Sequence, residues 1–219
     1  MISSRLARIF CLLLAGALGL VLPARAQILS TLGDSLSGAI GITVGSDEVY
    51  AASFTTGSNL TGYSVSSLTV QNAVDTQGVV SQNMGIYANS GSNPNMASGT
   101  LFLQQTFPAQ GNADVLYTPT TSLTLAPNTT YWLGITAGSN NTNGFEDTNK
   151  TTYTATNGWV LNSGMSYYND SIWTTYSPTP NILFSINATA LPTPEPSSWA
   201  LLGLGCTALW FLRHRSRSL

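Results

Sequence analysis

Apolar residues in the long middle of the chain recur at every second position, and this period constrains the fold more than any other feature. The alternation is clear at 63–70, 123–125 and 131–136, and it is typical of half-buried β-strands. The same reasoning predicts strands at 85–88, 101–104, 115–118, 159–162, 171–174 and 182–188. The one helical element expected in this domain is a short turn near 29–36. An all-β domain is therefore expected, built as a β-sandwich or jelly roll.

Two Asn-Gly pairs suggest tight turns. Asn157-Gly158 separates 153–156 from 159–161, which is the strongest hairpin signal in the chain, and Asn143-Gly144 is a weaker second case. The polar stretch 139–154 is expected to form an ordered loop.

The N-terminus has the three parts of a secretory signal peptide. Arg5 and Arg8 are followed by an apolar run at 9–22 and by Ala24-Arg25-Ala26, an A-x-A cleavage site. Residues 1–26 are thus predicted to form a signal helix that directs Sec-type export and is removed before Gln27. The alternative is an uncut signal anchor.

The C-terminus has a second three-part pattern. A Pro-rich linker at 190–198 is followed by an apolar helix at 199–212 and a basic cytoplasmic end at 213–219, where Arg213, Arg215 and Arg217 would stop transfer. Fourteen helical residues span about 21 Å, less than the roughly 30 Å of membrane hydrocarbon. This weakly held helix is either a removable sorting signal or an ordinary membrane anchor.

The motif Pro194-Glu195-Pro196-Ser197, with the helix and arginines after it, resembles the PEP-CTERM sorting signal of Gram-negative bacteria. The resemblance covers residues 192–219; Thr193 stands where Val is commonest, and His214 and Ser216 interrupt the basic end. It implies processing near the motif by the membrane peptidase exosortase. It also implies a place at the cell envelope, on the cell surface or in an extracellular polysaccharide-rich layer, as in a biofilm matrix.

A second resemblance covers most of residues 48–188, within the predicted surface domain at 27–189. The segments 50–57, 85–87 (ahead of Pro94) and 125–133 resemble the choice-of-anchor R domain of bacterial surface proteins. This resemblance implies a surface β domain without assigned activity.

The net charge and the residue types of this domain exclude several classes of function. Between Gln27 and Leu191 one basic residue, Lys150, stands against eight acidic ones, a net charge of about −7, which disfavours nucleic acid as a partner. The chain's one histidine is His214 in the tail, so the domain cannot assemble a Ser-His-Asp triad or a histidine-ligated metal site. We expect no cofactor and no enzymatic activity. The remaining enzymatic alternative is glycoside hydrolysis by Glu48 and Glu146, with Asp47 and Asp147 beside them.

Aromatic residues motivate a binding hypothesis. Trp132 and Trp159 are expected to fill the core, whereas Tyr167, Tyr168 and Trp173 lie among Gly, Asn and Asp residues and are candidates for contact with a glycan. The domain is therefore predicted to be non-enzymatic and structural or adhesive in an exopolysaccharide layer. The alternative is a carbohydrate-binding, or less favourably carbohydrate-active, module released after cleavage.

A weaker hypothesis concerns calcium. Asn141, Asn143, Glu146, Asp147 and Asn149 place oxygen ligands on the polar stretch, and oxygen is the donor that Ca²⁺ prefers. Their spacing lacks the EF-hand pattern, so a solvated polar loop is the competing interpretation.

Overall fold

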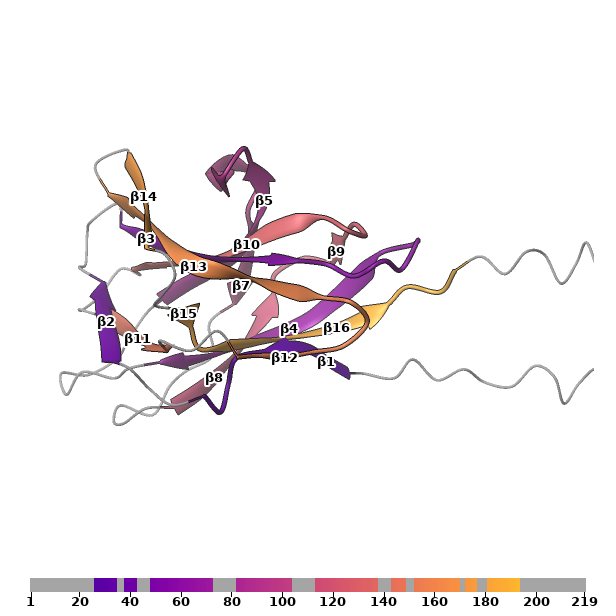
Figure 1. Cartoon of the computed structure of the whole chain (residues 1–219), viewed down its shortest axis with the longest axis horizontal. Coiled ribbons are helices and arrows are strands. Elements are labelled where there is room, and N and C mark those ends of the chain that lie inside the picture. The colour runs from indigo at the N-terminus through magenta and orange to yellow at the C-terminus, as the bar shows by residue number, and fades with distance from the viewer. Residues whose placement is uncertain are drawn as a thin grey trace, which may run out of the picture.

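The fold of the 219-residue chain is seen in a computed structural model (Figure 1). The structure describes residues 26–34, 38–42, 48–72, 82–103, 113–137, 143–148, 152–169, 172–176 and 181–193. Within these ranges the elements are β-strands and one 3₁₀ turn, η1 (Met96–Ser98). Every strand pair there is antiparallel. The prediction of an all-β fold is confirmed.

Most strands belong to one continuous pairing path, which we divide into two halves. Half I contains β12 (Thr154–Ala155), β1 (Ala26–Ser30), β16 (Phe184–Ala190), β4 (Tyr63–Asn72) and β8 (Ala113–Pro119), with β9 (Leu123–Leu125) paired to β4. Half II continues through β7 (Thr100–Leu103), β5 (Gln82–Ser90), β10 (Thr130–Ala137), β3 (Val49–Thr55), β13 (Val160–Asn169) and β14 (Ile172–Tyr176), with β6 (Asn93–Pro94) paired to β5. A separate three-stranded sheet joins β15 (Asn181–Ile182), β11 (Asn143–Thr148) and β2 (Gly38–Ile42).

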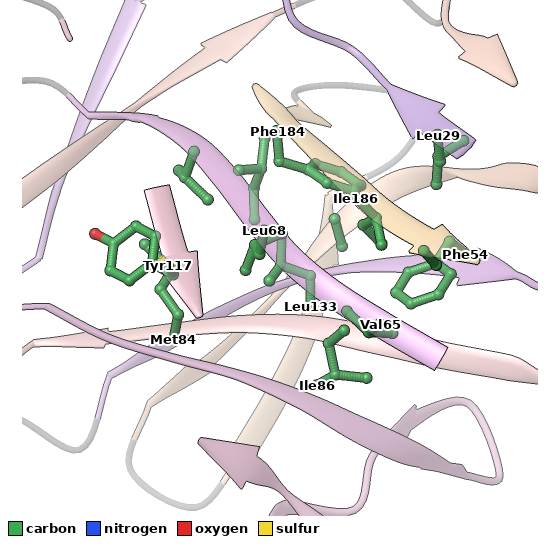
Figure 2. Packing of buried hydrophobic residues seen from close by; sticks show 14 of the residues in the cluster. Leu29, Phe54, Val65, Leu68, Met84, Ile86, Tyr117, Leu133, Phe184 and Ile186 are labelled. Carbon is green, nitrogen blue, oxygen red and sulfur yellow. The ribbon is translucent and has the colours of Figure 1, made fainter. Parts of the chain in front are cut away.

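The two halves share one hydrophobic core. Leu68, Phe184 and Ile186 of half I lie in the same buried cluster as Phe54 and Leu133 of half II (Figure 2). Strand alternation explains how the sequence supplies this core, because successive side chains of a strand point to opposite faces. One buried cluster therefore contains inward-facing side chains of both halves.

The predicted strands are found, and so are the two predicted core tryptophans. Trp159 is 2% exposed and Trp132 is 7% exposed. Trp159 lies in the shared core, whereas Trp132 belongs to a second buried cluster on the other face of half II. Half II therefore buries apolar side chains on both of its faces, in the shared core and in this second cluster.

The Asn157-Gly158 turn forms, but the hairpin predicted around it is wrong. Asn157 (φ 55°) and Gly158 (φ 75°) are both left-handed, as a type I′ turn requires, and Trp159 N donates to Thr156 O at 3.2 Å. Ala155 before the turn nevertheless pairs with Leu29 of half I, and Val160 after it pairs with Thr55 of half II. The turn carries the chain from one half to the other because Trp159 is drawn into the core between them.

Two further expectations are corrected. In place of the helical turn expected near 29–36, the described residues up to Asp34 form the end of β1 and a tight turn in which Asp34 N donates to Thr31 O at 3.3 Å. The polar stretch 139–154, expected as a loop with a turn at Asn143-Gly144, contains β11, which begins at Asn143 and pairs with β2. Partner strands distant in sequence satisfy the backbone there, and the local turn signal does not reveal them.

The first and last described strands lie side by side (Figure 1). β1 pairs antiparallel with β16, so that Ala26 lies opposite Ala188. Ala26 and Gln27, which flank the predicted cleavage point, are both in β1. In the part of the chain that the structure describes, no helix is long and apolar enough to cross a membrane. Residues 1–25 of the predicted signal helix and the hydrophobic helix at 199–212 lie outside the described residues. Ala26, the last residue of the predicted signal helix, is instead the first residue of β1.

Candidate functional site: an aromatic outer face

The face of half II that points away from the shared core carries a second set of aromatic residues. On β10, Leu133 and Ile135 enter the core, so Trp132 and Gly134 occupy this outer face. One line of register pairs crosses five strands of this face, and we call it the outer row. It consists of Trp173, Tyr168, Val49, Thr136 and Asn83.

Tyr168 and Trp173 form the aromatic end of the outer row. They are cross-strand neighbours on β13 and β14, their ring centroids lie 5.1 Å apart and their planes are tilted by 47°. Both side chains are only partly buried. Two rings held in contact on neighbouring strands, each with exposed surface, provide a platform on which another molecule can stack.

Trp173 also packs against a buried cluster on the same face. This outer cluster comprises Ala51, Tyr87 and Trp132. The indole Nε1 of Trp132 donates to Asn89 Oδ1 at 2.8 Å, which satisfies its polar atom and fixes the ring. The outer cluster thus gives the partly buried Trp173 a fixed packing surface.

Glycines make room for the Tyr87 ring on the sheet surface. A Cβ added to Gly85 would lie 2.6 Å from the Tyr87 hydroxyl, and one added to Gly134 would lie 2.6 Å from a Tyr87 ring carbon. Gly99, just after η1, approaches the same ring. Tyr87 is consequently 5% exposed, and this desolvation raises the pKa of its phenol.

Tyr87 is expected to make the fold sensitive to alkaline pH. Because the folded-state pKa of Tyr87 is raised, the unfolded chain loses its phenolic proton at lower pH than the folded chain does. This part of the stability is fully present below the ordinary tyrosine pKa of about 10 and is lost as pH rises through the raised folded value. Urea unfolding at pH 8 and pH 11 should therefore show a larger loss for the parent protein than for Tyr87→Phe. Tyr153→Phe, at an exposed tyrosine, is the matched control, and equal losses in the parent and Tyr87→Phe would contradict the assignment.

The structure separates Tyr167 from the other two residues of the predicted glycan-contact group. Tyr167 follows the opposite alternation of β13, where its ring lies 4.7 Å from that of Tyr50. Its hydroxyl donates to Glu48 Oε1 at 2.8 Å. The structure therefore brings together Tyr168 and Trp173 only.

The structure describes the side chain of only one of the two glutamates considered for glycoside hydrolysis. Glu48 accepts the Tyr167 hydrogen bond, whereas the side chain of Glu146 lies outside what the structure describes, as does Asp47. Within the described ranges no three His, Cys, Asp or Glu side chains gather as a metal site. Asn143, Glu146 and Asp147 of the calcium hypothesis are on β11, while Asn141 and Asn149 lie outside the described residues.

A small open pocket lies where the described chain ends, a feature that the sequence did not indicate. It has a volume of about 370 Å³ and is lined by Ser58, Asn59, Tyr63, Asn157, Gly158 and Ala190. Next to it the chain after β16 is clamped: Leu191 O accepts from Asn59 Nδ2 at 3.0 Å and from Thr61 Oγ1 at 2.6 Å, and Leu191 N donates to Gly62 O at 3.0 Å. The sequence signal for this contact is the turn-forming run 59–62. That run does not indicate its partner, Leu191, which lies some 130 residues away.

The sorting residues are not described structurally. The residues outside the described ranges are Ala24, Pro194, Glu195, Pro196, Arg213, Arg215 and Arg217.

No family model matches the chain, and no curated protein is significantly similar to it.

Proposed function

We propose that this chain is an exported bacterial surface or extracellular-matrix protein with a non-enzymatic structural or adhesive role in an exopolysaccharide layer. The N-terminal leader and the tail at 190–219 support export and sorting, through Sec-type machinery and an exosortase-like peptidase. Two resemblances support this proposal: that of the tail to the PEP-CTERM signal, and that of the domain to choice-of-anchor R.

The observation that carries the proposal is the placement of the two ends of the domain. β1 and β16 are paired neighbours, and the clamp holds Leu191 at the end of β16. A domain entered and left at one end is well suited to display by its tail, because the tether leaves the rest of its surface accessible. The transient membrane helix and the Pro-rich linker of the proposed signal would provide that tether.

The finer architecture is also part of the proposal. We infer a β-sandwich of jelly-roll type in which halves I and II are the two layers. The single core cluster that draws side chains from both halves supports this arrangement. Such a rigid body would present an outer sheet face to its surroundings.

Mass spectrometry of the protein from cells with and without the sorting peptidase tests the proposed processing. We expect the leader to be absent in both samples and the segment 199–219 to be lost only where the peptidase is present. An intact 199–219 segment in both samples would leave an ordinary membrane anchor. Retention of residues 1–26 would overturn the export proposal in its present form.

A carbohydrate-binding module released after cleavage is the second candidate. The half-exposed Tyr168–Trp173 pair favours it. Matrix protein and released module differ in where the processed domain is found: a matrix protein sediments with the cell-associated polysaccharide, and a released module stays in the culture fluid.

A further inference from the structure

We propose that the outer row binds an uncharged polysaccharide chain, which lies across the strands and stacks on Trp173 and Tyr168. This inference rests on the proposed adhesive role and gives it a site and a ligand class. The face concerned is formed by β14, β13, β3, β10 and β5, whose register is continuous there.

The aromatic end supplies the stacking surface. Sugar rings present C–H groups on their faces, which pack against aromatic rings, as partly exposed Trp173 and Tyr168 allow. Trp173 packs against the buried outer cluster. A ring supported in this way loses little side-chain freedom on binding, which favours affinity.

The other end of the outer row supplies polar groups. Thr136 is half-buried and Asn83 is exposed, while Val49 between them and Tyr168 is 5% exposed. Neighbouring strands lie about 4.8 Å apart, so the row from Trp173 to Asn83 is roughly 19 Å long. This length suits several consecutive sugar units, stacked at one end and hydrogen-bonded through their hydroxyls at the other.

Ser166 adds hydrogen-bonding capacity beside the rings. It lies two residues before Tyr168 on the same face of β13, it is 1% exposed, and its Oγ has no hydrogen-bond partner among the described residues. Ser166 is the register partner of Ala51, a member of the cluster against which Trp173 packs, so its hydroxyl lies on the same face as the indole. A buried hydroxyl without a partner is unusual, and a hydroxyl of a bound sugar would supply that partner.

Charge decides which polysaccharides fit. The members of the outer row are all uncharged, and the domain that carries them has a net charge of about −7. A polyanion rich in uronic acids would be repelled by this field, and no cation in the row would compensate. The ligand is therefore an uncharged chain.

Affinity electrophoresis of the mature protein purified from the producing cells tests this site. The probes are the neutral and acidic fractions of the polysaccharide extracted from the same cells, each cast into a native gel. We expect the neutral fraction to retard the protein, and Trp173→Ala and Tyr168→Ala each to weaken that retardation about tenfold, the size of one stacked aromatic contact. Trp173→Phe keeps a ring and should retain most of the affinity.

Tyr153→Ala is the matched control, because Tyr153 is an exposed aromatic residue outside the outer row. Thermal melts of every variant separate lost binding from lost folding. Unchanged retardation of Trp173→Ala, retardation by the acidic fraction alone, or no retardation by either fraction would each overturn the inference. Processing of the tail is measured separately, so a correctly processed protein that binds no polysaccharide would refute this site and leave the sorting proposal standing.

Discussion

Replacing Trp159 with alanine is expected to lower the free energy of unfolding by about 4 kcal/mol. The side chain is 2% exposed, its ring stacks on Phe54 at 5.5 Å with an interplanar angle of 6°, and it meets the edge of Tyr63 at 5.1 Å. Alanine would leave a large cavity between the two halves, and both neighbouring rings would lose a partner. The melting temperature should fall by about 10 °C, because a domain of this size loses a few degrees per kcal/mol.

Urea and thermal unfolding followed by far-UV circular dichroism measure this loss. Trp173→Ala is the matched control, since the same residue type is removed from a half-exposed position, and it should cost about 1 kcal/mol. Trp159→Phe separates ring packing from the indole N–H, which has no partner among the described residues. It should cost less than half as much as alanine. Equal losses in Trp159→Ala and Trp173→Ala would show that Trp159 does not join the two halves.

The substitution Gly57→Ala is expected to cost about 3 kcal/mol, an unusually large effect for one methyl group. A Cβ at this position would collide with the backbone carbonyl oxygen of Asn157 and lie 2.5 Å from the Tyr63 hydroxyl. The carbonyl belongs to the turn that crosses between the halves, so it cannot move without displacing Trp159. The requirement for glycine here is one of space.

Gly91→Ala is the informative comparison for Gly57→Ala. Gly91 has φ +65° and nothing within 4 Å of an added Cβ, so alanine there meets only the backbone penalty of about 1 kcal/mol. Denaturant unfolding of the two variants side by side distinguishes the two causes. If Gly57→Ala unfolds at the same urea concentration as Gly91→Ala, the close contact between residues 57 and 157 is not maintained in solution.

The strands could be predicted from the sequence because alternation is a local pattern. At Leu133 and Ile135 the period identifies both the strand and the face that enters the core. It does not identify the partner strands. No local sequence pattern indicates that Ala155 pairs with Leu29 or that Val160 pairs with Thr55. The residue types predict the Asn157-Gly158 turn. They do not predict the partners of the strands beside it, because burial of Trp159 is a long-range effect.

The candidate site was predicted in part for the same reason. Tyr167, Tyr168 and Trp173 are close in sequence, and composition alone groups them. Strand alternation separates Tyr167 from Tyr168, and the register of β13 with β14 joins Tyr168 to Trp173. Thr136 and Asn83 could not be added without the register of β10 with β3 and β5, because more than 30 residues of chain separate them from every other member of the outer row.

The position of β16 between β1 and β4 also determines how the domain bears mechanical load. Tension applied through the tail would act at Leu191, along the axis of a strand paired on both sides. Because antiparallel hydrogen bonds run perpendicular to the strands, such a pull shears both ladders at once and cannot peel them open one bond at a time. Asn59 and Thr61 donate hydrogen bonds to Leu191 O, just beyond the end of β16, so these two bonds would be loaded before the ladders.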